Sequence, residues 1–104
     1  MGPMETPDDS PVYLAVDLGA GSGRVIAGLL ENGRLRLEEV HRFPNQGLRL
    51  LNTWHWDVTG LYAHILEGLK QAGARYGKRV RSVGVDTWGV DYGLLDEAGE
   101  LLGI

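Results

Sequence analysis

The chain has 104 residues, of which 43% are hydrophobic and 23% charged, with a net charge of -4 and no cysteine. This balance is typical of one soluble globular domain, and it provides no basic field to attract nucleic acid or an anionic membrane. The lack of cysteine excludes disulfides and thiolate metal sites, and no apolar run approaches the roughly 20 residues that span a bilayer. We therefore expect a cytoplasmic protein with no nucleic-acid or membrane partner.

The N-terminal segment, Met1 to Pro11, contains acids and prolines but lacks the apolar stretch of a secretory signal. We predict a disordered leader over residues 1–11 and a folded region over residues 12–104. The folded region is rich in glycine, because the chain has 16 glycines in all. Apolar segments separate them, so many are expected at turns or at places where something approaches the backbone closely.

The first predicted elements are strands. Residues 12–16 form a continuous apolar run rich in β-formers, which predicts a strand buried on both faces. Residues 17–23 interrupt this run with three glycines, and residues 24–30 resume as a second strand. Asn32-Gly33 predicts a type I′ turn, since both central residues of that turn need positive φ, and residues 35–43 alternate loosely as a strand exposed on one face. The glycine loop therefore joins a strand to a hairpin and leads into no helix.

A long helix is predicted next, after an irregular connection over residues 44–56. Asp57 suits its N-cap, and Gly77 is expected to end it in the left-handed conformation, with Lys78 and Arg79 near the negative end of the helix dipole. One apolar face recurs at three- and four-residue spacing, formed by Val58, Leu61, Tyr62, Ile65, Leu66, Leu69, Ala72 and Tyr76.

The C-terminal part is predicted to return to strands. Residues 80–85 predict a second buried strand, and residues 92–95 and 101–104 flank a turn at 96–99 as a further hairpin. The order of elements predicts an α/β fold with a mixed sheet, β-hairpins and one long helix. Because the apolar pattern runs into Ile104, we expect the chain to continue in its native context.

The glycine loop, residues 19–24, matches neither of two common phosphate-binding motifs. A P-loop needs Lys-Ser/Thr opening a helix, and a dinucleotide fingerprint needs a third glycine where Arg24 stands. A loop at a hairpin bend can still bind an anion through a nest of backbone N–H groups, with Ser22 and Arg24 as side-chain donors and Asp17 holding a hydrated Mg²⁺. The alternative is a tight turn that Asp17 caps, with Arg24 as a solvated surface charge.

A second loop, Asp86 to Asp91, follows the later strand and so is expected at the carboxyl edge of the sheet, where open α/β folds place ligands. Asp86 and Asp91 can accept hydrogen bonds from sugar hydroxyls, Trp88 can stack on a sugar ring, and Gly89 lets a ligand reach the backbone. The alternative is that Trp88 fills the edge of the core while the aspartates cap turns.

Two other groups of residues receive structural interpretations. Trp54, His55 and Trp56 precede the predicted N-cap and are interpreted as a hydrophobic staple. The three histidines, His41, His55 and His64, fall at no metal-ligand spacing, so no metal site of their own is expected.

Several segments resemble, in the same order, the FGGY carbohydrate kinases. Residues 16–24, Val-Asp-Leu-Gly-Ala-Gly-Ser-Gly-Arg, look like the first phosphate motif of that family, and the Gly-Arg ending is most similar to the rhamnulokinases. Residues 41–45, 56–58 and 83–96 also resemble that subfamily. The resemblance extends from about Val12 to Ile104 and favours the ligand-binding interpretation of both loops.

The resemblance implies an actin-like fold, in which two lobes with ribonuclease-H-like cores close over ATP and sugar. It implies phosphoryl transfer from MgATP to the 1-hydroxyl of L-rhamnulose. The ATP-binding motif would correspond to Ala20, Gly21, Ser22, Gly23 and Arg24. Asp17 would be the acid near the metal and Gly89 a sugar contact, and we extend the sugar site to the neighbouring Asp86, Trp88 and Asp91. Gly21 departs from the serine or threonine common in relatives, which would weaken a side-chain contact there.

The resemblance also implies parts that this chain lacks. The family's proton-accepting aspartate, its adenosine-binding motifs and its second lobe all lie beyond the region covered here. Since phosphoryl transfer depends on positioning and charge stabilisation in a closed cleft, we expect no catalytic residue and no activity in the chain alone. We also expect marginal stability, because missing strands would leave apolar edges open.

Three alternatives remain open from the sequence. The first is another ketose specificity in the same family, such as xylulose, ribulose or fuculose. The second is a non-catalytic actin-like module that binds nucleotide. The third, compatible with the kinase interpretation, is a fragment with no function of its own.

Overall fold

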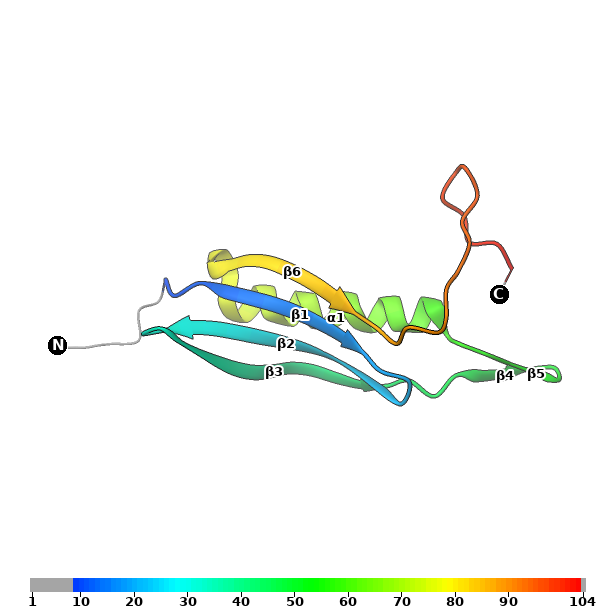
Figure 1. Ribbon diagram of the computed structural model, residues 1–104, viewed down its shortest axis with the longest axis horizontal. Helices are drawn as coiled ribbons and strands as arrows, with labels where there is room; N and C mark the ends of the chain where they lie inside the picture. The colour runs from blue at the N-terminus through cyan, green and yellow to red at the C-terminus, as the bar shows by residue number, and fades with distance from the viewer. Residues whose placement is uncertain (1–8, 104) are drawn as a thin grey trace.

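The computed structural model describes residues 9–103 and contains a four-stranded sheet with one long helix packed against one face (Figure 1). The strand order is β3-β2-β1-β6. β1 (Val12–Leu18), β2 (Ser22–Glu31) and β3 (Arg34–Pro44) form an antiparallel meander, and β6 (Val80–Asp86) pairs parallel to β1. The connection from β3 to β6 contains the helix α1 (Val58–Tyr76). The predicted mixed sheet with hairpins and one long helix is confirmed.

The turns between strands follow their local chemistry, with one exception. Asn32 and Gly33 join β2 to β3 with φ values of 54° and 75°, as the predicted type I′ turn requires. The predicted irregular connection over residues 44–56 is wrong in part, because it contains a small hairpin of β4 (Leu48–Leu50) and β5 (Thr53–His55). In the turn of this hairpin, Leu51 has a φ of 56°. A leucine does not indicate positive φ, so the sequence did not predict this turn.

The core lies between the sheet and the helix, and it uses alternate residues of the strands. Its buried members are Val12, Leu14, Val16, Val25, Ala27, Leu29, Val40, Ala72 and Tyr76.

The prediction that residues 12–16 and 80–85 are buried on both faces is wrong for the residues that the structure describes. Tyr13 on β1 is 41% exposed, and Val83 and Val85 on β6 are 51% and 65% exposed. The physical reason is that one helix covers one face of the sheet while β6 lies at its edge. The radius of gyration, 17.1 Å, exceeds the ~13 Å typical of a compact domain of about 100 residues, which agrees with this open packing.

The ends of α1 are set by side-chain and backbone caps. Asp57 is the N-cap as predicted, since its carboxylate accepts a hydrogen bond of 3.0 Å from the backbone N–H of Gly60. Gly77 ends the helix with positive φ (57°) but with ψ at -128°, which is not the left-handed helical conformation predicted. A short 3-10 turn, η1 (Gly77–Arg79), follows it and leads into β6. Within the described residues no helix is long and apolar enough to cross a membrane.

The predicted apolar face of α1 is buried only along part of its width. Gly68, Ala72 and Tyr76 are buried, and Ile65 and Leu69 pack against the core. Three other members of that face, Val58, Tyr62 and Leu66, are about half exposed, at 50%, 61% and 48%. The sheet covers only the side of the helix that carries Gly68 and Ala72, so these three side chains remain partly open to solvent.

The predicted segments at the two ends of the chain are partly outside the described residues. Residues 1–8 of the predicted leader lie outside the described residues, but Ser10 is buried and its carbonyl accepts a hydrogen bond of 3.0 Å from Arg79. The predicted C-terminal hairpin, whose last residue also lies outside the description, forms a single bridge between Leu95 and Leu101. Asp96 closes its turn by accepting from the backbone N–H groups of Ala98 and Glu100. The segment forms no longer strand pairing because it projects from the sheet (Figure 1).

The contact between α1 and the sheet depends on the missing side chain of Gly68. A Cβ atom there would lie 2.4 Å from Cγ2 of Val25 and 3.3 Å from Cβ of His41. We predict that Gly68→Ala lowers the free energy of unfolding by about 1–3 kcal/mol, the usual cost of overpacking. Gly73→Ala is the matched control, because a Cβ atom at Gly73 meets nothing within 4 Å, and it should raise stability by about 0.5–1 kcal/mol. Urea titrations followed by circular dichroism measure both, and equal effects would contradict the close contact.

A second prediction concerns pH. The hydroxyl of the buried Tyr76 donates a hydrogen bond to the carboxylate of Glu38 on β3. This hydrogen bond lowers the pKa of Glu38. Burial and the same hydrogen bond raise the pKa of Tyr76 above its ordinary value. The protonated tyrosine is therefore favoured by folding, so its contribution is complete below about pH 10, the ordinary tyrosine pKa, and is lost as pH rises through the folded-state value. We predict that the unfolding free energy falls above pH 10 more steeply in the wild-type chain than in Tyr76→Phe. Parallel slopes in the two proteins would exclude this coupling.

Candidate functional site

The glycine loop lies at one end of the sheet, at the same end as the carboxyl end of β6 (Figure 1). It connects β1 to β2 by a tight turn in which the backbone N–H of Gly19 donates to the carbonyl of Ser22 over 2.8 Å. Ala20 and Gly21 lie in the turn, and Ser22, Gly23 and Arg24 open β2. The predicted position of this loop between a strand and a hairpin is confirmed.

The glycines of this loop adopt no unusual backbone angles, and Gly23 is the one that packs closely against a side chain. None of Gly19, Gly21 and Gly23 has positive φ, so none of them adopts the left-handed conformation that one kind of anion-binding nest uses. A Cβ atom at Gly23 would lie 2.4 Å from the ring of Phe43, whereas one at Gly21 would meet nothing within 4 Å. Gly23 is therefore required by the fold, and Gly21 has room for the serine or threonine expected there.

The side chain of Arg24 binds two other polar side chains at the loop. Arg24 forms an ion pair with Asp17, its register partner on β1, and donates a hydrogen bond of 2.9 Å to the hydroxyl of Ser22. The side chain of Arg24 is only 22% exposed, so the alternative of a solvated surface charge is wrong. Its Nε–H is buried without a hydrogen-bond partner in the described structure. The loop thus presents one carboxylate, one hydroxyl and one guanidinium in direct contact.

Asn45 supports the loop from the end of β3 and was not singled out in the sequence as a site residue. Its side-chain amide donates to the carbonyl of Gly19 over 2.8 Å, and its backbone N–H donates to the carbonyl of Gly21 over 3.2 Å. Asn45 is only 3% exposed, so these bonds satisfy a buried polar group. The available signal was its place in the segment over residues 41–45 that resembles the kinase family.

Asp86 ends β6 directly beside Asp17, because the two residues are partners in the parallel register of β6 and β1. A hollow of about 430 Å³ lies there, and its lining includes Asp17, Asp86, Ile26 and Val85. The predicted position of Asp86 at the carboxyl edge of the sheet is confirmed. No group of three or more acidic, histidine or cysteine ligands occurs among the described residues, so this pair could supply only part of a metal's coordination shell.

The second predicted loop folds around Asp91. One carboxylate oxygen, Oδ2, accepts hydrogen bonds from Nε1 of Trp88 over 2.6 Å and from Nε1 of Trp56 over 2.8 Å. The two indole rings lie 4.7 Å apart at an angle of 52°. Asp91 Oδ2 is therefore used to bind the two tryptophans. The hydrophobic-staple interpretation of Trp56 did not include this hydrogen bond. Trp54 instead is 66% exposed and lies under Arg49, whose Cζ is 5.4 Å from the ring centroid.

Gly89 follows Trp88 in this loop, and its position has open space in the described structure. A Cβ atom at this position would meet nothing within 4 Å, and its φ is not positive. The fold therefore gives no reason for a glycine here.

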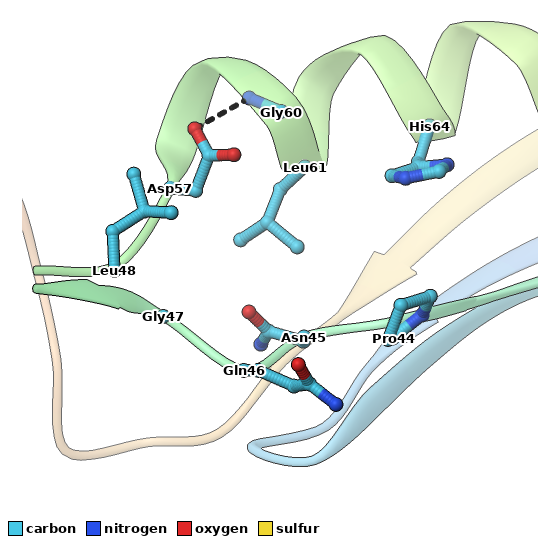
Figure 2. A pocket seen from close by; sticks show the side chains of 9 residues that line it. All are labelled: Pro44, Asn45, Gln46, Gly47, Leu48, Asp57, Gly60, Leu61 and His64. Atoms are coloured by element: carbon cyan, nitrogen blue, oxygen red, sulfur yellow. Dashed lines mark hydrogen bonds between the residues drawn. The ribbon is translucent and has the colours of Figure 1, made fainter.

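A separate pocket of about 200 Å³ lies between α1 and the segment after β3 (Figure 2). Asp57 points to its helix cap at Gly60 there, and Asn45 is occupied with the glycine loop. None of the predicted site residues lines this pocket. We therefore place the candidate site at the glycine loop and the loop of residues 86–91.

The difference between Gly23 and Gly21 gives a direct test of how the loop is built. Because a methyl group at Gly23 would overlap the buried Phe43 ring, we predict that Gly23→Ala destabilises the chain by about 1–3 kcal/mol. Gly21→Ser should leave the melting temperature almost unchanged, since that position has open space. Thermal melts of both variants measure this, and a stable Gly23→Ala protein would show that the Phe43 contact is wrong.

No protein-family model matches the chain, but comparison with curated proteins finds clear relatives. A rhamnulokinase of Oceanobacillus iheyensis is 56% identical over 84 residues, which are 81% of this chain and 18% of that protein. A rhamnulokinase of Bacteroides thetaiotaomicron is 49% identical over 86% of this chain and 18% of its own length. One of Bacillus subtilis is 43% identical over 88% of this chain and 19% of its own length.

These relatives confirm the resemblance found in the sequence. The chain spans about a fifth of the length of the curated relatives that it matches. More than four-fifths of this chain aligns with each of these proteins. The chain is a relative of the rhamnulokinases, a group of carbohydrate kinases, over most of its own length and over about a fifth of theirs.

Proposed function

We propose that this chain supplies the phosphate-binding loop and the sugar-facing loop of an ATP-dependent kinase that phosphorylates the 1-hydroxyl of L-rhamnulose. The observation that carries the proposal is its 43–56% identity to proteins named rhamnulokinase. The sheet order, with β6 parallel to the first strand of an antiparallel meander, supports an actin-like lobe with a ribonuclease-H-like core. We assign residues 12–104 to the first lobe of such a kinase.

The ATP side of the proposed site is the loop of Ala20 to Arg24. Arg24 is the charged donor, and it is paired with Asp17 of β1. A triphosphate with its metal offers each of them a new partner: the phosphate oxygens suit the guanidinium of Arg24, and the metal suits the carboxylate of Asp17. Ser22, which already accepts from Arg24, would add a hydroxyl donor.

A magnesium ion fits the residues present. Mg²⁺ is usually held by one or two carboxylates, with waters and substrate phosphates as its other ligands. Asp17 and its strand neighbour Asp86 provide such carboxylates beside the hollow at the sheet's edge. When bound, the metal would offset the negative charge of the phosphates during transfer.

The sugar side of the proposed site is the loop of residues 86–91. Gly89 allows close approach of a ligand, since nothing in the described fold occupies the place of its missing side chain. Trp88 offers a ring face for stacking, and Asp86 and Asp91 offer carboxylate oxygens as acceptors for sugar hydroxyls. These side chains select and orient the ketose in this proposal, and none of them removes the proton from its 1-hydroxyl.

The chain alone is proposed to be inactive, and the complete enzyme to work in the cytoplasm. Phosphoryl transfer needs a closed cleft that contains a base and a full nucleotide site. The two loops of this chain would form only part of such a cleft. Another ketose specificity within the same family, or a nucleotide-binding module without catalysis, would use the same glycine loop. The ketose preference and the effect of Gly89 separate these alternatives.

The decisive experiment replaces the matching 84 residues of the Oceanobacillus iheyensis rhamnulokinase by this chain. We predict that the hybrid enzyme consumes ATP with L-rhamnulose in preference to xylulose, ribulose and fuculose, and that the unmodified 104-residue chain releases no sugar-dependent ADP. Gly89→Ala in the hybrid should raise KM for the sugar at least tenfold and leave KM for ATP unchanged, with Gly73→Ala as the control. Preference for another ketose, or an unaltered sugar KM, would contradict the assignment.

A further inference from the structure

Trp56 is joined to the sugar-facing loop although it lies 32 residues earlier in the sequence than Trp88. It sits between the hairpin β4–β5 and the N-cap of α1. Its indole N–H donates to Asp91 Oδ2 over 2.8 Å, and its ring lies 4.7 Å from that of Trp88. We call this group of Trp56, Trp88 and Asp91 the tryptophan clamp.

The clamp fixes one carboxylate oxygen with two donors. An indole has one N–H donor and no acceptor, so each tryptophan can only donate, and both donate to the same Oδ2. Hydrogen bonds to an ionised acceptor are stronger and more directional than neutral ones. Because Oδ2 is occupied, Oδ1 is the oxygen of Asp91 that remains for a ligand hydroxyl.

The two donors differ in what they tie together. Trp88 is only three residues from Asp91, so its hydrogen bond is internal to the loop and cannot set where the loop lies. Trp56 belongs to the segment that leads into α1, whose cap at Asp57 is fixed by its bond to Gly60. The bond from Trp56 therefore connects the loop to the helix, across 35 residues of sequence.

The loop has little else to hold it in the part of the chain that the structure describes. Val90 in the loop and Tyr92 directly after it are 85% and 88% exposed, and a Cβ atom at Gly89 meets nothing within 4 Å. The tryptophan clamp thus connects this exposed loop to the segment that leads into α1.

We infer that Trp56 is a positioning residue of the sugar site, whose indole N–H holds Asp91 and thereby presents the loop of residues 86–91 to the ketose. This inference rests on the proposed function for its sugar, but the positioning itself concerns only residues of this chain. The Trp56 ring orients the acceptor and does not need to touch the reacting hydroxyl.

The test uses ¹H–¹⁵N NMR of the 104-residue chain, whose three tryptophans, Trp54, Trp56 and Trp88, give three indole N–H signals. Asp91→Ala should move the Trp56 and Trp88 signals upfield and leave that of the exposed Trp54 in place. Trp56→Phe keeps an aromatic ring but removes the donor, and it should shift the backbone amides of residues 87–91 and lower their heteronuclear NOE values. Trp54→Phe is the matched control and should alter neither.

Titration with L-rhamnulose then tests the link to the ligand. The wild-type chain should show shifts at the Gly89 amide and the Trp88 indole, and Trp56→Phe should weaken the apparent affinity at least tenfold, with an unchanged melting temperature. A Trp56→Phe chain whose loop signals and sugar affinity equal those of the wild type overturns the inference and leaves the proposed function intact. A wild-type chain that ignores the sugar while Trp56→Phe disorders the loop contradicts the proposed sugar contact instead. Loss of melting cooperativity in Trp56→Phe shows a role in folding and overturns the positioning role.

Discussion

The packing of the Phe43 ring against the bare backbone of Gly23 is the contact on which the arrangement of the site depends. The ring is almost fully buried, at 2% exposure, and it stacks on His64 of α1 with centroids 4.7 Å apart. Phe43 therefore joins the start of β2, the end of β3 and the helix at one place. Asn45, two residues further on, uses that fixed position to hold the carbonyl groups of Gly19 and Gly21. The shape of the glycine loop thus follows from side-chain packing beneath it.

The electrostatics of the loop follow from the strand register. Antiparallel pairing of β1 and β2 places Arg24 opposite Asp17, and parallel pairing of β1 and β6 places Asp86 beside the same aspartate. Two carboxylates and one guanidinium are thereby gathered at one edge of the sheet by backbone hydrogen bonds alone. Such a group has a net negative charge that suits a cation, while Arg24 retains a donor for phosphate. In the proposed function, these three neighbouring strands would supply the carboxylates for the metal and the guanidinium for the phosphates.

The remaining surfaces explain why the described fold is open. One helix covers one face of the sheet, so Tyr13, Val83 and Val85 face no protein partner among the described residues, and β6 leaves one edge unpaired. Unpaired edges and exposed apolar strands favour association with other chains. The relatives are about five times longer than the stretch that matches this chain, and a protein of that length has further elements that can cover such surfaces.

The sequence by itself determined the features that depend on neighbouring residues. Alternating apolar residues, the Asn32-Gly33 turn, the Asp57 cap and the periodicity of α1 predict the order and type of the main elements, because each reflects local backbone preferences. The ordered motifs also identified the relatives. The hairpin at Leu51 was missed because a non-glycine residue there adopts positive φ, for which the sequence carries no signal.

Only the tertiary structure decided which residues meet across long stretches of chain. It showed that Gly23 is needed for the Phe43 ring whereas Gly21 has open space, that Asn45 supports the glycine loop, and that Trp56 binds Asp91. It also showed that the apolar strand β1 is covered on one face only and that β6 is exposed along most of its length. These outcomes depend on how the helix and loops pack against the sheet, and that packing is set by contacts between residues far apart in sequence, which no local pattern encodes.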